Sequence, residues 1–246
     1  MTEQDRTPKR FEQLQARDWK RAMSDPCTGD WTEQWTLDGQ RASIRNTPGG
    51  MIFAAGPVPQ DHGSHAVLWT KQDFAGDVRI DFDFERLDTI NRWVNILYIQ
   101  ATGAGPQPWV EDIQAWAHLR HIPRMSTYFS HMNLLHISYA AFGNDNDEPD
   151  DYVRVRRYPV GEGRSFHDIA VEPDYLKTGL FQPGVAYHMT VIKAGHELLM
   201  QVSGDDQQRL FAWDTSGFDP LAHGRIGIRH MWTRCSRYAN FTVDTA

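Results

Sequence analysis

The sequence predicts an all-β protein built as a sandwich of two antiparallel sheets, and three observations support this fold class. Most of the chain after residue 40 consists of short apolar or alternating runs separated by Gly, Pro, Asn and Asp, which is typical of many-stranded sandwiches. No regular crossover helix joins one run to the next, which disfavours parallel βαβ units. The 246 residues, 40% hydrophobic and 12% aromatic, suffice for a full core and exclude a disordered or coiled-coil chain.

The strands are predicted by about twelve runs, each of them short and bounded by turn residues. In chain order these runs are 42–44, 50–55, 66–70, 78–86, 93–102, 134–142, 152–158, 187–194, 197–203, 210–214, 225–232 and 238–243. Neighbouring side chains of a strand point to opposite faces of its sheet. The Val and Ile side chains of the later runs are therefore expected to face the core, which leaves His136, Arg154 and Arg229 on the opposite surface.

Two segments predict helices. Residues 6–23 place apolar side chains such as Phe11 and Leu14 on one loose face, so residues 1–25 are expected to form a helical extension at the N-terminus. Residues 106–120 carry apolar side chains at spacings of three and four, which predicts a short helix inserted in a loop between strands. No linker or repeat divides the chain, and we expect one jelly-roll domain over residues 1–246.

Charge and composition narrow the class of partner. The formal net charge is -7, with 25 Lys and Arg against 32 Asp and Glu, which argues against a nucleic-acid ligand. The longest apolar run, 51–55, is far shorter than the roughly 20 residues that a membrane helix needs. The charged N-terminus has no apolar signal core, so we expect a cytoplasmic protein. The sequence leaves the oligomeric state open.

Several segments resemble the YesU-like family. They are 35–39 (WTLDG), 49–51 (GGM), 67–74 (VLWTKQDF), 95–103 (NILYIQATG), 125–133 (MSTYFSHMN), 224–232 (GRIGIRHMW) and 238–241 (YANF). The resemblance implies a concanavalin-like jelly roll, in which one of two stacked sheets is concave and carries a ligand groove. It also implies a link to the use of pectin-type and other uronic-acid polysaccharides, although the family is a domain of unknown function.

A dense cluster of Tyr, His, Asn and Arg side chains predicts which ligand the groove binds and how it could cleave it. Arginine forks accept carboxylates in a bidentate geometry, so the cluster suits an acidic, uronic-acid-containing oligosaccharide. Cleavage by β-elimination needs a base, an acid and a group that neutralises the carboxylate. We assign Tyr128 or His131 as the base, His136 as its acid or base partner, and Arg154 with Asn133 as the neutralising groups. A tyrosine base would need nearby cations to lower its pKa from about 10.

Further residues are candidates for contacts with the substrate through ring stacking or hydrogen bonds. They are Trp69, Asn95, Tyr98, Gln100, Asn133, Tyr139, Tyr152, Arg156, Arg229 and Trp232.

Two alternatives to the lyase stay open. Asp81, Asp83 and Glu85 share one face of a strand at steps of about 6.6 to 7 Å, which suits a retaining glycoside hydrolase but equally a solvated strand face. The same groove could also serve a non-catalytic carbohydrate-binding module. No organic cofactor is predicted. The acidic loop 144–151 carries Asp and Asn oxygens that suit a structural calcium ion, with an ordinary turn as the alternative.

Overall fold

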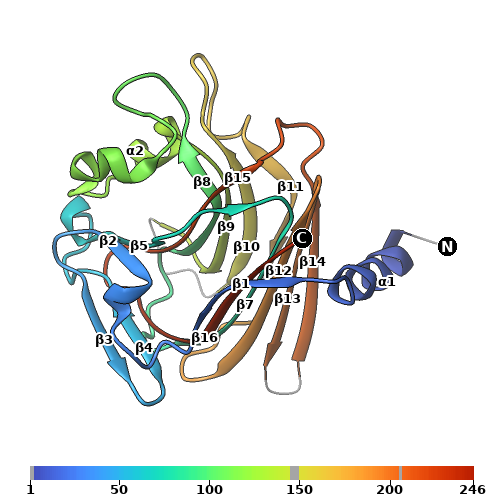
Figure 1. Cartoon of the computed structure of the whole chain (residues 1–246). Coiled ribbons are helices and arrows are strands. Elements are labelled where there is room, and N and C mark those ends of the chain that lie inside the picture. Colours follow the sequence, from blue (N-terminus) through green and yellow to red (C-terminus); the bar gives the residue numbers. More distant parts are fainter. Residues whose placement is uncertain (1–2, 145–149, 205–206) are drawn as a thin grey trace.

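The computed structural model describes residues 3–144, 150–204 and 207–246, with side chains from residue 7 onward. Its strands form two antiparallel sheets of eight strands each, which confirms the predicted all-β sandwich (Figure 1). Sheet 1 contains β1 (Lys20–Asp25), β3 (Ser43–Thr47), β4 (Gly50–Ala54), β7 (Val78–Arg86), β12 (Ala186–Ala194), β13 (Glu197–Gly204), β14 (Gln207–Asp214) and β16 (Cys235–Thr245). Sheet 2 contains β2 (Trp35–Asp38), β5 (Ala66–Thr70), β6 (Phe74–Ala75), β8 (Asn95–Gly103), β9 (Met132–Ala141), β10 (Tyr152–Tyr158), β11 (Ala170–Leu176) and β15 (His223–His230).

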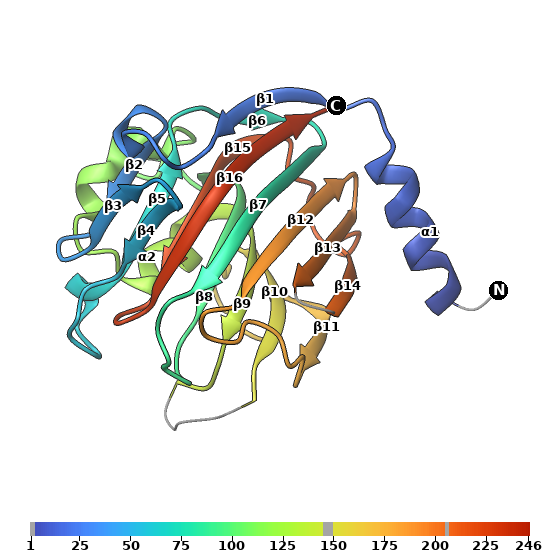
Figure 2. The ribbon, with the colours of Figure 1, turned by 90° about the horizontal axis from the view of Figure 1, so that it is seen from below.

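The strand order brings distant segments together. Sheet 1 runs β14-β13-β12-β7-β16-β4-β3, with β1 paired to β16, and Figure 2 shows these strands side by side. Sheet 2 runs β11-β10-β9-β8-β15-β5-β2, with β6 paired to β15. The central strands β7 and β16 are far apart in the sequence, so the centre of sheet 1 depends on a long-range pairing.

The main core lies between the two sheets. In β7, Ile80, Phe82 and Phe84 are buried in this core together with Leu97 and Ile137 from sheet 2. The intervening Asp83 and Glu85 point to the outer face, as the alternation predicts. The apolar periodicity of β7 therefore fixes which of its side chains are available to solvent.

A second apolar cluster covers the outer face of sheet 2. Ile96 and Tyr98 alternate with the core residues of β8 and pack in this cluster with Trp116 and Tyr128. These two covering residues come from the 3-10 segment η3 (Ile113–Arg120) and from the helix α2 (Met125–His131). The predicted insertion between strands thus exists, and it lies over a sheet face (Figure 1).

The N-terminal prediction needs a correction. Helix α1 spans Glu3–Gln15, and Phe11 and Leu14 pack against the outer face of β12 and β13. Residues 20–25 are not helical but form β1, because their backbone pairs with residues 241–245 of β16. A strand partner more than 200 residues away leaves no local trace in the sequence. The strands β2, β6 and β11 were also missed. Among the described residues no helix has the length and apolar character needed to cross a membrane.

Candidate functional site

Four residues predicted for the groove meet beneath η3 and α2. Trp69 stacks on Tyr98 with ring centroids 5.4 Å apart, and Tyr98 stacks on Tyr128 at 6.0 Å. The Arg229 guanidinium lies over the Tyr128 ring at 4.5 Å. All four side chains are fully buried. These four candidates therefore lie together, but they are closed to a ligand in this conformation.

A single carboxylate holds the covering segments onto sheet 2. The Oδ2 atom of Asp38 accepts hydrogen bonds from Trp69 Nε1 at 2.7 Å, Arg120 Nε at 2.6 Å and Tyr128 OH at 2.9 Å. Asp38 and Arg120 are both buried, so this ion pair is shielded from solvent. Because the three donors come from β5, η3 and α2, the Asp38 cluster joins the sheet to both of its covering segments.

The acid and base roles predicted for His136 and Tyr128 do not hold in this conformation. His136 is 3% exposed and shares hydrogen bonds with the Tyr158 hydroxyl, through Nδ1 at 2.6 Å, and with the Ser138 hydroxyl, through Nε2 at 2.7 Å. Burial, with a contribution from Arg156, lowers the pKa of His136 well below its usual value. Burial and the Asp38 charge raise the pKa of Tyr128 well above 10, the opposite of what a base requires.

The three groove candidates on β10 lie on the outer side of sheet 2. Arg154 donates to Asp174 at 2.6 Å and lies over the Tyr152 ring at 4.4 Å. Arg156 is buried and lies 3.5 Å from the other oxygen of Asp174. The sequence analysis expected these arginines to bind the carboxylate of a sugar. In the structure they lie against the carboxylate of Asp174 instead.

Three further candidates point to the inside of the sandwich, so their predicted contacts with a substrate are wrong for this structure. Asn95 donates to Ser236 Oγ at 2.9 Å, and the Tyr139 hydroxyl meets that of Tyr238 at 2.8 Å. Gln100 donates to two backbone carbonyls, those of Phe74 and Gly76. Alternation alone could have placed Asn95 and Tyr139, since they share a face with Leu97 and Ile137.

The remaining candidates lie apart from one another. Trp232 is 9% exposed and packs against His65 at 4.1 Å. His131, at the end of α2, stacks on Trp109 with the ring centroids 3.8 Å apart. Asn133 donates to Thr102 Oγ1 at 3.3 Å and lines two pockets at one end of the sandwich.

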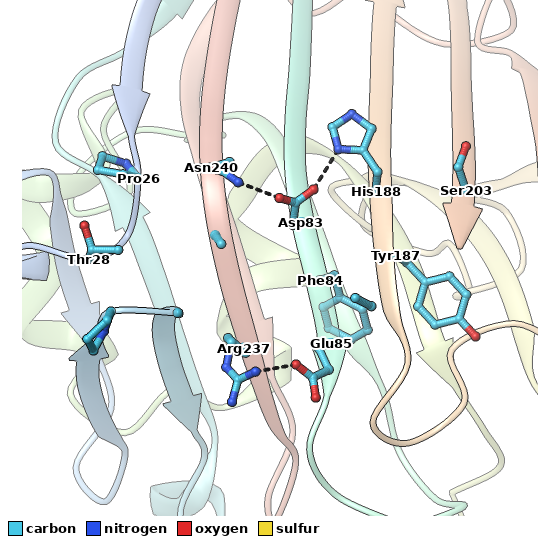
Figure 3. Close-up of a pocket in the computed structure, with 14 residues that line it drawn as sticks. Pro26, Thr28, Asp83, Phe84, Glu85, Tyr187, His188, Ser203, Arg237 and Asn240 are labelled. Atoms are coloured by element: carbon cyan, nitrogen blue, oxygen red, sulfur yellow. Dashed lines mark hydrogen bonds and ion pairs between the residues drawn. The ribbon is translucent and has the colours of Figure 1, made fainter. Parts of the chain in front are cut away.

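An open pocket of about 640 Å³ lies on the outer face of sheet 1 (Figure 3). We call it the sheet 1 pocket. Its polar side chains come from neighbouring strands: Asp83 and Glu85 from β7, His188 from β12, and Arg237 with Asn240 from β16. Strand pairing explains the arrangement, since Asp83 is the register partner of His188 and Glu85 that of Arg237.

Acceptors and donors alternate across this pocket. Asp83 accepts from His188 Nδ1 at 2.8 Å and from Asn240 Nδ2 at 2.6 Å, while Glu85 accepts from Arg237 at 2.6 Å. Asn240 has a φ of 51° at an irregularity of β16, and asparagine tolerates this left-handed conformation better than most residues. Figure 3 shows both carboxylates with their partners facing the same opening.

The third acidic residue of this strand does not line the pocket. Asp81 is 8% exposed and accepts from Arg79 at 2.7 Å and from Thr190 at 2.7 Å. Although burial opposes ionisation, hydrogen bonds from His188, Arg79 and Thr190 lower the pKa of Asp81 to about 2. The predicted carboxylate trio is thus reduced to Asp83 and Glu85.

His188 gives this pocket a measurable pH dependence. The Asp81 and Asp83 carboxylates raise the pKa of His188 from 6.5 to about 9, so the folded state favours the protonated ring. The resulting stabilisation is complete below about pH 6.5 and is lost as the pH rises through about 9. We expect His188→Gln to lower the free energy of unfolding, obtained from urea denaturation, more at pH 6 than at pH 10. The difference is expected to be at most about 1 kcal/mol, because the ring is half exposed. A His188 ring that titrates near pH 6.5 by NMR would contradict this.

No metal centre is evident. Among the described residues no group of three or more His, Cys, Asp and Glu side chains could hold a metal ion. Residues 145–149 of the predicted calcium loop lie outside the described residues. Of its last two residues, Asp150 pairs with Lys177 at 3.0 Å, and Asp151 accepts from Thr178 Oγ1 and the Gly179 amide.

Several solved structures share this fold. A protein of unknown function with a galectin-like fold from Bacillus subtilis is 18% identical, with a TM-score of 0.66, over 92% of this chain and 97% of that one. The exoplasmic/lumenal domain of VIP36, in its Ca²⁺/Man3GlcNAc-bound form, is 12% identical with a TM-score of 0.57, over 94% and 91%. Lectin UEA-II complexed with galactose is 10% identical with a TM-score of 0.57, over 92% and 100%.

These likenesses show the fold and agree with the predicted jelly roll. No curated protein matches the chain. A family model described as "Domain of unknown function (DUF1961)" matches residues 28–243, which leaves α1, the whole of β1 and the C-terminal end of β16 outside it. The narrower YesU-like naming stays a prediction. The chain belongs to the DUF1961 family.

Proposed function

We propose that this protein binds an oligosaccharide in the sheet 1 pocket. The observation that carries the proposal is the opening of about 640 Å³, into which fixed acceptors and donors project from three adjacent strands. Its volume lies within the range of about 300 to 1,000 Å³ that is usual for ligand pockets. A sugar hydroxyl both donates and accepts hydrogen bonds, so an array such as Asn240–Asp83–His188 can orient it.

The fold comparisons support a sugar as the ligand class. The solved structures of the VIP36 domain and of lectin UEA-II contain Man3GlcNAc and galactose, respectively. At 12% and 10% identity they carry no residue assignment to this chain. The location of the site therefore rests on the pocket itself.

The charges of the pocket favour an uncharged sugar. Asp83 and Glu85 contribute two negative charges, and Arg237 with protonated His188 contributes two positive ones. This balance offers no net attraction to a uronate carboxylate. For the sheet 1 pocket we therefore propose neutral sugar units, and the predicted acidic ligand needs a different subsite.

Hydrolysis by Asp83 and Glu85 is the second candidate, because both carboxylates line the pocket. A retaining glycosidase needs two carboxyl groups about 5 to 5.5 Å apart, one of which holds a proton. Here both carboxylates are already engaged as hydrogen-bond acceptors, Asp83 with His188 and Asn240, and Glu85 with Arg237. We therefore propose binding as the activity. β-Elimination by Tyr128 and His136 would first require η3 and α2 to leave sheet 2.

A binding and cleavage screen tests the proposal. The purified protein is titrated by calorimetry with manno-, galacto- and xylo-oligosaccharides and with oligogalacturonides, and the mixtures are assayed for reducing ends and for ultraviolet absorbance of an unsaturated uronide. We expect at least one neutral oligosaccharide to bind and none to be cleaved. Failure of the whole neutral series to bind would overturn the binding proposal, and new reducing ends or unsaturated products would replace it with hydrolysis or elimination.

A further inference from the structure

A second polar region lies at one end of the sandwich. Two pockets of about 340 and 380 Å³ share Asn133, at the start of β9. The segment between β14 and β15 forms one wall of both: residues 216–219 line the first pocket, and Pro220 with Ala222 line the second. The two openings therefore adjoin each other at the ends of β8, β9 and β10. We call the first of them the Arg157 pocket.

Arg157 is a buried cation that makes no ion pair within 4 Å in the described part of the chain, and the Asp219 carboxylate acts on it only from a longer distance. It is 6% exposed, and its Nε and Nη2 atoms donate to the Asp219 carbonyl at 3.2 and 2.9 Å. Its Nη1 atom donates to the Tyr158 carbonyl. A guanidinium has five N–H donors, so one N–H on each terminal nitrogen remains available. Two adjacent N–H groups of this kind match the two oxygens of a carboxylate.

A second arginine strengthens the positive character of this pocket. Arg164 also lines it, is exposed, and makes no ion pair within 4 Å in the described part of the chain. Asp219 is the only acidic residue among the described residues that line this pocket. In the adjoining pocket the Glu111 carboxylate lies 2.7 Å from His223 Nε2. Two guanidiniums against one carboxylate leave a net positive charge.

We infer that the Arg157 pocket binds the carboxylate of a small anionic ligand, held by Arg157 and Arg164. Taken with the proposed function, on which this assignment of ligand class rests, the carboxylate belongs to a uronic-acid unit. Desolvation strengthens the interaction, because the pocket holds the Arg157 charge away from bulk water. The acidic sugar expected from the sequence thus binds Arg157, on the inward side of β10, and not Arg154 on the outer side.

The test compares D-glucuronate with D-glucose by calorimetric titration of the full chain, with inorganic sulfate and phosphate as further probes. We expect glucuronate to bind at the Arg157 pocket and glucose, which lacks the carboxylate, not to bind there. Arg164→Gln is expected to weaken glucuronate binding about tenfold, the scale of one hydrogen bond to a charged group. Arg157→Lys, which keeps the charge but loses the fork, is expected to weaken it at least as much. Arg154→Gln, on the same strand but paired with Asp174, is the matched control and is expected to bind as the parent does.

The histidine ring signals separate failure of this inference from failure of the proposed function. Glucuronate is expected to shift the NMR signals of His223, which lines the adjoining pocket, and not those of His188. Equal binding of glucose, unchanged affinity in both arginine variants, or tighter binding of sulfate or phosphate would each overturn the carboxylate site. A shift of His188 alone would place the anion in the sheet 1 pocket, which contradicts this inference but not the proposal of sugar binding.

Discussion

Replacing Asp38 with alanine is expected to lower the free energy of unfolding by about 3 to 5 kcal/mol, the usual cost of removing one partner from a buried ion pair. The Asp38 carboxylate accepts from Trp69, Arg120 and Tyr128, and the variant leaves the 1%-exposed Arg120 charge without its carboxylate partner. Because these donors belong to β5, η3 and α2, the loss is expected to loosen the cover over sheet 2. Urea denaturation measures the effect.

Two control variants show whether the loss of stability is specific to the buried charge of Asp38. Asp38→Asn keeps the shape but not the charge, and is expected to be less destabilising than alanine. Arg41→Ala removes a surface ion pair with Asp61, whose side chains are 50% and 34% exposed, and is expected to change stability by about 1 kcal/mol or less. An Asp38→Ala protein as stable as the Arg41→Ala protein would show that the Asp38 cluster does not hold the covering segments.

Asp83→Ala is expected to weaken oligosaccharide binding by about 10- to 150-fold, which corresponds to the loss of hydrogen bonds to a charged acceptor. The carboxylate is both a direct acceptor for a sugar hydroxyl and the group that orients His188 and Asn240. Calorimetric titration with the tightest-binding neutral oligosaccharide measures the change.

The matched control is Asp73→Ala. Asp73 is half exposed, lies outside the pocket lining and, among the residues that the structure describes, makes only a 3.5 Å ion pair with Arg225. This variant is expected to bind as the parent does, and both variants are expected to unfold at similar urea concentrations. Unchanged affinity in Asp83→Ala would remove the sheet 1 pocket as the binding site.

The fold was predictable because its signals are local. Alternation in 78–86 put Phe82 and Phe84 in the core and Asp83 and Glu85 outside, and the structure has this arrangement. The strand β1 escaped prediction because its only partner is β16, and α1 was drawn too long for the same reason. Local periodicity reports which side of a strand is apolar, but not which distant strand pairs with it.

The candidate site was less predictable because accessibility is a tertiary property. Tyr98, Tyr128 and Arg229 do converge on the outer side of sheet 2, as polar and aromatic side chains on one face suggested. Nothing in their spacing shows that Trp116 and the helix carrying Tyr128 cover that face. Polar residues on a sheet surface predict an open groove only where no other segment packs over them.

For the sheet 1 pocket, the sequence predicted part of the candidate site but not the rest. Its two carboxylates are visible in the sequence as an alternating acidic run, but their partners are not. His188 and Arg237 lie more than 100 residues from Asp83 and Glu85 and reach them only through strand register. A fixed register within β7, β12 and β16 turns three unrelated segments into one array of donors and acceptors.

The most direct measurement of the central claim is a histidine NMR titration of the full chain with the tightest-binding neutral oligosaccharide. His188 lies in the sheet 1 pocket, whereas His136 is buried on the outer side of sheet 2. The account predicts that the His188 ring signals shift in a saturable manner while those of His136 stay in place. Shifts of His136 with His188 unchanged would contradict it, because the sugar would then bind beneath α2.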